Sequence, residues 1–258
     1  MKSTLLSFHQ VEFGYVPKVV PLFKGLNLLL EEGSVTTILG PNGAGKSTVL
    51  LLAMGWLKCR QGEVRLSGKP IQQFSRQALG REMAFIPQAE HIPFEYTTLE
   101  YVLLGRTPFL PPLGVPGKED LNKAYAALEQ VGATHLFNHP ILAISGGERQ
   151  LVVLARALAQ QPRLLLMDEP SAHLDLANKF RLAQVIRSLQ GNGCTILLTT
   201  HEPDFALAAS DNAILMKKGR VLYSGPMAGA ATDQHFSSLY DLQVKVREVE
   251  GKPQVIWH

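Results

Sequence analysis

The chain has 258 residues, of which 46% are hydrophobic and 18% are charged, which suits one large α/β domain with a sizeable insert. The 25 Lys and Arg residues nearly balance the 22 Asp and Glu residues, so a net charge of +3 argues against nucleic-acid binding through phosphate neutralisation. No apolar run reaches the roughly 18 residues of a membrane-spanning helix, and the first ten residues do not resemble a signal peptide, so we expect a soluble chain.

Cys59 and Cys194 are the two cysteines of the chain, and they match neither a disulfide framework nor a metal site. This usage is typical of a reducing compartment. We expect both side chains to be small core residues.

Strand and helix signals alternate over the first third of the chain. The predicted strands are residues 5–13, 26–30, 35–39, 63–66 and 83–86. Residues 35–39 are β-branched and apolar, as expected for a buried strand. They lead into a glycine-rich loop over residues 40–45, and a helix is predicted from residue 46 to about 57.

The pattern changes between about residues 89 and 160. This region is interrupted by Pro93, Pro108, Pro111, Pro112 and Pro116. A helix is predicted over 119–131, and strand signals are absent until residue 164. We interpret the region as a helical insert with a proline-rich connector. The predicted elements after it are strand 164–168, helix 177–190, strands 195–199 and 213–216, and a small β appendage within 242–257.

The phosphate-binding pattern G-x-x-x-x-G-K-[ST] lies between a predicted strand and a predicted helix, as Gly40-Pro41-Asn42-Gly43-Ala44-Gly45-Lys46-Ser47-Thr48. Glycines let backbone N–H groups turn inward around phosphates, and the start of a helix adds a favourable dipole. We expect Lys46 to reach the β- and γ-phosphates, the Ser47 hydroxyl to ligate Mg²⁺, and Thr48 to reach the α-phosphate.

Two carboxylates, Asp168 and Glu169, end the apolar strand that starts at Leu164. Unpaired carboxylates at a buried strand end are costly, so packing alone does not explain them. We expect Asp168 to hold Mg²⁺ through a bound water. Glu169 can act as general base toward an attacking water or polarise it.

Ser145-Gly146-Gly147-Glu148 opens a helix predicted over residues 148–160. Alone, such a segment is commonly a flexible turn. Its place between the glycine loop and the acidic strand favours a second anion site at a helix start.

These motifs, in this order and spacing, resemble those of an ATP-binding cassette (ABC) nucleotide-binding subunit over residues 6–225. The residues that carry the resemblance are 40–48, Gln88, 144–148, 164–169, Asp175 and His201. The resemblance implies an ATPase that uses ATP and Mg²⁺. It also implies an α/β fold with a RecA-like P-loop NTPase core, an antiparallel β subdomain and an inserted helical subdomain. We place the core and β subdomain at 1–88 and 161–225, the helical subdomain at 89–160, and a C-terminal appendage at 226–258.

Four single residues match family positions. Tyr15 resembles the aromatic residue that stacks on adenine, although a strand-edge tyrosine is the alternative. Gln88 resembles the Q-loop glutamine, which touches Mg²⁺ or the water and senses the transport partner. His201 resembles the switch histidine that bonds the γ-phosphate, and Asp175 resembles the D-loop residue at a dimer seam.

The family arrangement implies that Ser145, Gly146 and Gly147 bind a γ-phosphate held by another subunit. Because each motif occurs once, two copies must meet head to tail, and a monomer should hydrolyse ATP poorly. Ile144 and Glu148 depart from the Leu and Gln usual in the family. Glu148 either caps the helix or repels nucleotide.

The stretch Val102–Phe109 resembles the Gly-Arg-x-Pro segment of cassettes that energise metal-chelate importers, and 175–178 fits the same group. Those importers carry iron siderophores, haem, cobalamin, molybdate or tungstate. A generic helix before a proline loop is the alternative.

The importer resemblance implies two transmembrane permease subunits, one of whose helices enters a groove lined by 90–112. It also implies a periplasmic or lipoprotein solute-binding protein and a place at the cytoplasmic face of the plasma membrane. Two alternatives stay open: the ATPase of an ABC exporter, and a soluble ABC protein of translation or DNA repair.

Overall fold

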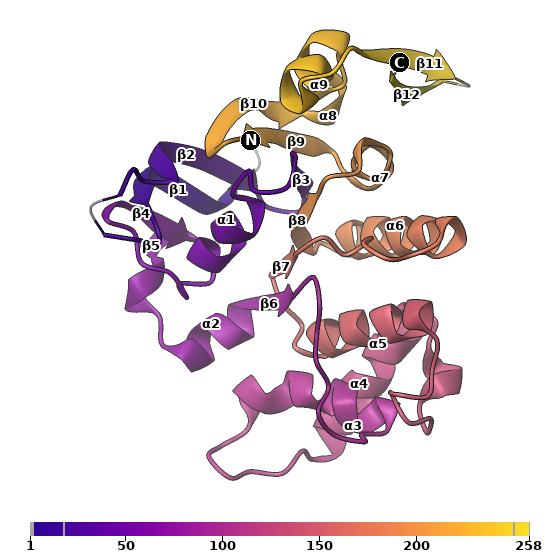
Figure 1. The fold of residues 1–258 in the computed structure, drawn as a ribbon. Helices are drawn as coiled ribbons and strands as arrows, with labels where there is room; N and C mark the ends of the chain where they lie inside the picture. Colours follow the sequence, from indigo (N-terminus) through magenta and orange to yellow (C-terminus); the bar gives the residue numbers. More distant parts are fainter. Residues whose placement is uncertain (1–2, 18, 250, 258) are drawn as a thin grey trace.

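The computed structural model describes residues 3–17, 19–249 and 251–257, which form three sheets and several groups of helices (Figure 1). The strands are β1 (Thr4–Phe13), β2 (Phe23–Glu31), β3 (Val35–Leu39), β4 (Gln61–Leu66), β5 (Lys69–Pro70), β6 (Met83–Ile86), β7 (Leu164–Met167), β8 (Thr195–Thr200), β9 (Asn212–Lys217), β10 (Arg220–Pro226), β11 (Val244–Val249) and β12 (Lys252–Trp257). The α-helices are α1 (Lys46–Ala53), α2 (Arg76–Glu82), α3 (Thr98–Leu103), α4 (Lys118–Gln130), α5 (Gly146–Ala159), α6 (Leu176–Gly191), α7 (Pro203–Ala209), α8 (Met227–Ala230) and α9 (Asp233–Tyr240). Short 3-10 turns are η1 (Ile71–Gln73), η2 (Leu104–Phe109) and η3 (Thr134–Leu136).

The largest sheet has the strand order β10-β9-β3-β8-β7-β6. Strands β9, β3, β8, β7 and β6 are parallel, and β10 pairs antiparallel with β9. Every residue of β3, β7 and β8 is buried, as expected for parallel strands covered on both faces. The second sheet, β2-β1-β4-β5, is antiparallel, so the structure confirms the mixed α/β fold.

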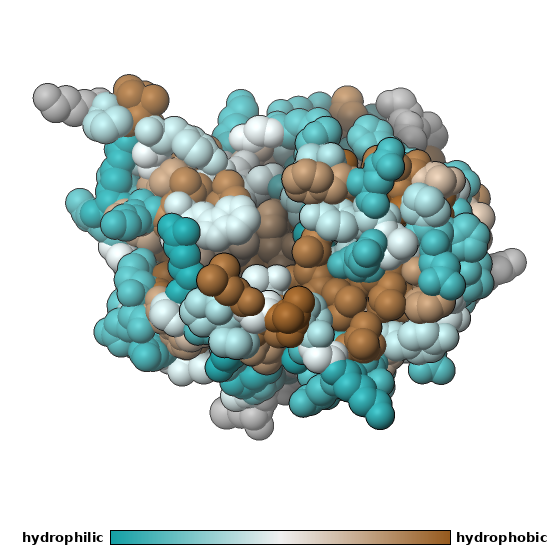
Figure 2. All heavy atoms as spheres, turned by 90° about the horizontal axis from the view of Figure 1, so that it is seen from below, coloured by the Kyte–Doolittle hydropathy of each residue, from teal (hydrophilic) through white to brown (hydrophobic). Residues whose placement is uncertain are grey.

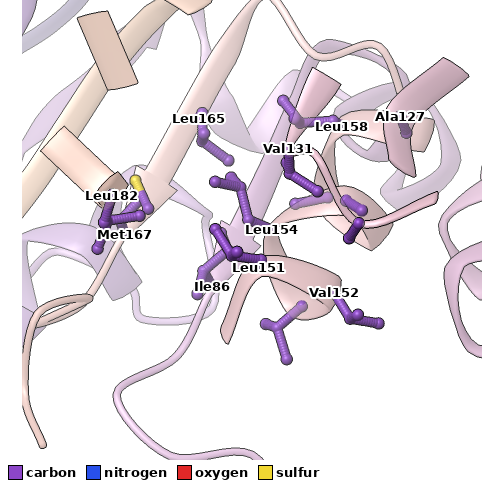
Figure 3. Close-up of a cluster of buried hydrophobic side chains, with 14 of the residues drawn as sticks. Ile86, Ala127, Val131, Leu151, Val152, Leu154, Leu158, Leu165, Met167 and Leu182 are labelled. Atoms are coloured by element: carbon purple, nitrogen blue, oxygen red, sulfur yellow. The ribbon is translucent and has the colours of Figure 1, made fainter. Parts of the chain in front are cut away.

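Strand β7 divides its side chains between two hydrophobic cores. Leu164 and Leu166 belong to the core shared with α1 and the antiparallel sheet. Leu165 and Met167 point to the opposite face because successive strand residues alternate. There they join Leu154 and other residues of α5 in the cluster drawn in Figure 3. One buried core therefore fastens the helices at the bottom of Figure 1 to the central sheet.

The end of the molecule that carries α3 and α4 exposes several apolar side chains. Figure 2 views the molecule from below and shows hydrophobic groups gathered among polar ones. In the loop between η2 and α4, Leu113 and Val115 are exposed. Within the described part of the chain, no helix is long and apolar enough to cross a membrane.

Several boundaries differ from the sequence prediction. The helix expected to reach residue 57 ends at Ala53, because Met54 closes it and Gly55 adopts a left-handed backbone with φ of +68°. Helix α2 was not predicted, since none of its residues is buried and its apolar pattern is weak. The β appendage is confirmed as the antiparallel pair β11 and β12, and α8 and α9 precede it.

Candidate active site

The glycine loop connects the end of β3 to α1, and its backbone depends on glycine at defined points. A Cβ on Gly40 would lie 2.0 Å from the Met216 carbonyl oxygen, so no larger residue fits there. Gly43 and Gly45 have φ values of +77° and +104°, a region that side chains disfavour. The loop is thus set by its own sequence and by close contact with β9.

Lys46, the first residue of α1, is 5% exposed and lies under this loop. Its Nζ donates to the carbonyl oxygens of Gly40 at 2.9 Å and Pro41 at 3.2 Å. The same nitrogen lies 3.1 Å from Oε1 of Glu169. The lysine therefore joins the loop to the carboxylate that follows β7.

Asp168 lies just after β7, and one of its carboxylate oxygens accepts hydrogen bonds from two hydroxyl groups. Ser47 Oγ donates to Asp168 Oδ1 at 3.0 Å, and Thr199 Oγ1, from β8, donates to it at 2.6 Å. Hydroxyl and carboxylate oxygens are the hard ligands that Mg²⁺ prefers. Ser47 and Asp168 are therefore close enough to hold one Mg²⁺ between them together with phosphate oxygens and waters.

Glu169 is buried and has an unusual backbone. Its φ is +45°, which is uncommon for a residue other than glycine. Its N–H donates to Thr199 Oγ1 at 2.9 Å, and its Oε2 is 2.8 Å from His201 Nδ1. Burial opposes the charge, but the hydrogen bonds and charges of Lys46 and His201 outweigh burial and hold the pKa of this carboxyl below its usual value. An ionised carboxylate with one edge toward lysine and the other toward imidazole can accept a proton from water.

Thr199 is a site residue that the sequence analysis missed. It ties Asp168 and Glu169 to β8 through a single hydroxyl. A usable signal was present, since a threonine inside a strand that pairs with the acidic strand places a hydroxyl beside the carboxylates.

Tyr15 and Gln88 flank this group of residues. The Tyr15 hydroxyl forms a 2.9 Å hydrogen bond with Thr48 Oγ1, and its ring, 63% exposed, meets Phe13 edge-on. Gln88 is exposed two residues beyond Ile86, whose register partner is Met167, so it leaves the sheet at the same edge as Asp168. Among the described residues, the Gln88 side chain makes no hydrogen bond to Ser47 or Asp168.

Ser145 to Glu148, here called the signature segment, form the start of α5. Ser145 donates its backbone N–H at 2.9 Å and its hydroxyl at 2.6 Å to Glu148 Oε2, and Glu148 N–H donates back to Ser145 Oγ at 3.3 Å. This reciprocal pair is a capping box. The Ser145 hydrogen bonds hold the pKa of Glu148 below its usual value, with a smaller contribution from His135. Of the two roles considered for Glu148, the structure shows the cap.

The two signature glycines have different surroundings. A Cβ on Gly146 would meet no atom within 4 Å, whereas one on Gly147 would lie 2.5 Å from the Asn178 side chain. Asp175 caps α6 by accepting the Asn178 N–H at 2.8 Å. Within the part of the chain that the structure describes, no hydrogen bond or ion pair joins the signature segment to Lys46, Asp168 or Glu169.

A groove lies beside Gln88, between the end of α1 and the helices that follow β6. It is lined in part by Trp56, Phe85 and Leu104. Arg156 of α5 forms a 2.6 Å ion pair with Glu90 on its wall. Apolar surface flanked by fixed charge is suited to receiving a helix of another protein.

A protein-family comparison matches residues 23–172, more than half of the chain, to the ABC transporter family. The chain belongs to this family. Over 242 residues this ABC protein is 35% identical to the iron(3+)-hydroxamate import ATP-binding protein FhuC of Bacillus subtilis, covering 93% of this chain and 89% of that protein. Over 235 residues it is 36% identical to the hemin import ATP-binding protein HmuV of Myxococcus xanthus, covering 88% and 87%.

A solved structure also resembles this ABC protein. The chain superposes on one from a metal-chelate type ABC transporter in an inward-facing conformation with a TM-score of 0.86 and 28% identity, covering 99% of this chain and 97% of that one. The expected ABC ATPase activity and the resemblance to ATPases of metal-chelate importers are therefore confirmed.

Proposed function

We propose that this protein is the ATP-hydrolysing subunit of an importer for a metal chelate or a related small solute. It acts as a head-to-tail homodimer beneath two transmembrane permease subunits at the cytoplasmic face of the plasma membrane, supplied by a periplasmic or lipoprotein solute-binding protein. The observation that carries the ATPase chemistry is the Lys46–Glu169–His201 chain of contacts. Import as the direction of transport is supported by FhuC and HmuV, whose names state it.

In this proposal the core carries the chemistry, and the helical subdomain at 89–160 presents the signature segment to the other copy. The phosphates of ATP lie against residues 40–48, and adenine stacks on the exposed ring of Tyr15. The groove lined by Trp56, Phe85 and Leu104 receives a permease helix next to Gln88. Movement of that helix then reaches the nucleotide through the Q-loop.

Arriving phosphates change the partners of Lys46. Its ammonium is bonded to Glu169 Oε1, and phosphate oxygens compete for it because charge-assisted hydrogen bonds are strong. Glu169 is then free to take a proton from the attacking water, while His201 keeps its other edge oriented. Ser47 and Asp168, with Gln88 nearby, would hold a Mg²⁺ ion, which would neutralise phosphate charge. Asp175, at the seam, contacts the other copy.

Glu169→Gln tests the chemistry. The amide cannot accept the proton, so we expect ATP turnover to fall by about 100-fold or more while ATP binding persists and an ATP-bound dimer accumulates. Light scattering with and without ATP measures the dimer, and Glu82→Gln, which removes a carboxylate paired with Arg163 far from the site, is the matched control. Unaltered turnover in Glu169→Gln would refute Glu169 as the base.

Uptake tests the direction and class of transport. Cells that carry only the Glu169→Gln protein should lose accumulation of a ferric hydroxamate, hemin or another metal chelate. Purification of the tagged protein from membranes should also recover a polytopic permease. Recovery with ribosomes or DNA-repair proteins instead would favour the soluble alternative, and solute accumulation in the mutant cells would favour an exporter.

A further inference from the structure

The C-terminal appendage consists of helices α8 and α9 and the hairpin β11–β12. It shares a hydrophobic core with β3, β9 and α7. Phe236 and Leu239 of α9 are fully buried and belong to the same cluster as Leu39 and Ala206. Leu39 is the last residue of β3, directly before Gly40, and Ala206 lies in α7, which follows His201. The appendage is thus packed against both segments that lead to the nucleotide site.

Tyr240, the last residue of α9, makes the most direct contact between the appendage and the site. Its hydroxyl donates a 3.0 Å hydrogen bond to the backbone carbonyl of His201. Lys217, at the end of β9, donates to the Ser238 carbonyl and to Asp241, which holds this end of α9 in place. Burial, with a smaller contribution from Asp204, raises the pKa of the Tyr240 phenol, so the hydroxyl stays protonated and remains a donor.

The peptide group between His201 and Glu202 is held at both of its polar atoms. The Tyr240 hydroxyl donates to the carbonyl oxygen of this peptide, which belongs to His201. The N–H of the peptide, which belongs to Glu202, donates to Thr200 Oγ1 at 3.0 Å. Two fixed ends set the rotation of this peptide plane, and the plane sets where the His201 side chain leaves the backbone. That side chain reaches Glu169 Oε2 through Nδ1 at 2.8 Å.

We propose that Tyr240 is a positioning residue for ATP hydrolysis, which holds the His201–Glu202 peptide so that the imidazole meets Glu169 and the γ-phosphate. The inference rests on the proposed function, because the role of His201 belongs to it. The C-terminal appendage then takes part in the ATPase cycle through one hydroxyl and does more than cover the sheet edge.

Tyr240→Phe isolates that hydroxyl, because phenylalanine keeps the ring and its packing. We expect kcat for ATP to fall about fivefold, the effect of one ordinary hydrogen bond, while KM stays unchanged and the thermal midpoint falls no further than in the control variant. Tyr223→Phe is the matched control, since Tyr223 lies in β10 and donates to the Pro226 carbonyl at 2.8 Å within the same region. That control should leave kcat unchanged. The full chain is assayed at a protein concentration that saturates its specific activity.

A double-mutant cycle separates positioning of His201 from any other role of Tyr240. In a His201→Ala background, measured by single turnover, Tyr240→Phe should cause no further loss of rate. An equal fivefold loss in that background, or unchanged kcat in Tyr240→Phe alone, would overturn the inference while leaving the proposed function intact. Unchanged turnover in His201→Ala alone would instead overturn the proposed role of His201, and the inference with it.

Discussion

The residues around Lys46 and those of the signature segment are held in different ways. Lys46, Glu169 and His201 form a continuous set of contacts drawn from the start of α1, the loop after β7 and the loop after β8. The signature segment is capped by its own Glu148, and Gly146 has open space where a side chain would project. The first group is organised by one chain, whereas the second presents a surface whose glycine serves no packing need in that chain.

This difference separates two kinds of glycine in one protein. Gly40 is required by a neighbouring strand of the same chain, as its contact with Met216 shows. Gly146 has no such neighbour, so packing within the described chain does not require glycine at that position. In the head-to-tail dimer that we propose, the nucleotide of the other copy would approach Gly146 closely. Four substitutions test the comparison.

Lys46→Ala should have the largest effect. It removes the ammonium from the phosphate loop and leaves Glu169 buried without its cation, so we expect ATP affinity to fall by about 100-fold or more. Calorimetric titration with ATP measures this affinity. Lys179→Ala, which breaks a more exposed pair with Glu202, is the control and should bind ATP normally. Wild-type affinity in Lys46→Ala would refute its contact with phosphate.

Gly146→Ala should have the second largest effect, and only in the assembled dimer. The added methyl meets no atom within 4 Å in its own chain, so the thermal midpoint and ATP affinity of the monomer should not change. We expect ATPase activity to fall about tenfold or more, because the methyl lies where the partner's phosphate must approach. Gly147→Ala provides the contrast, since its methyl requires the Asn178 side chain of the same chain to move, so its effect is not confined to the dimer. Normal ATPase activity in Gly146→Ala would argue against a phosphate above this segment.

Thr199→Val tests the two hydrogen bonds that Thr199 makes, one to Asp168 and one to the Glu169 N–H. The exchange leaves the buried Glu169 N–H without its acceptor and removes a donor from Asp168, at a cost of about 1–3 kcal/mol in the free energy of unfolding. Denaturant titration measures this cost. Thr107→Val removes an exposed hydroxyl that bonds the Leu104 carbonyl and should change stability by less than about 0.5 kcal/mol. Equal stabilities for the two variants would contradict a stabilising role for the hydrogen bonds of Thr199.

Glu148→Gln should have the smallest effect. Glutamine can still accept the Ser145 hydrogen bonds, so the cap and the thermal midpoint should persist. Removing one negative charge at the helix start should raise ATPase activity by a factor of about two, through tighter closure on nucleotide. A tenfold loss would instead show that the carboxylate itself is required.

The sequence predicted the parts of the site that short motifs carry. Strands β3 and β6 begin and end where predicted. The fold brings Lys46 and Ser47 against Asp168 and Glu169, although Ser47 and Asp168 are 121 residues apart. The capping role of Glu148 was also readable, because Ser-x-x-Glu is the pattern of a capping box.

Two contacts outside the motifs were not predicted. Thr199 bonds the Glu169 N–H and the Asp168 carboxylate, and its place in a strand beside the acidic strand was a signal that could have been used. Tyr240 acts across 39 residues of sequence on a backbone carbonyl, which leaves no mark on residue type. Helices α8 and α9 were missed because they are short and their buried faces are completed by residues of other elements.

The Lys46–Glu169 pair gives the lysine of the phosphate loop a counter-ion within the same chain. In the mechanism that we propose, ATP binding exchanges one anion for another around this cation, and the displaced carboxylate is the proposed base. Release of nucleotide would let Glu169 pair with the lysine again. Because the pair is more than nine-tenths buried, salt screens it little, and the exchange should respond more to competing phosphate than to ionic strength.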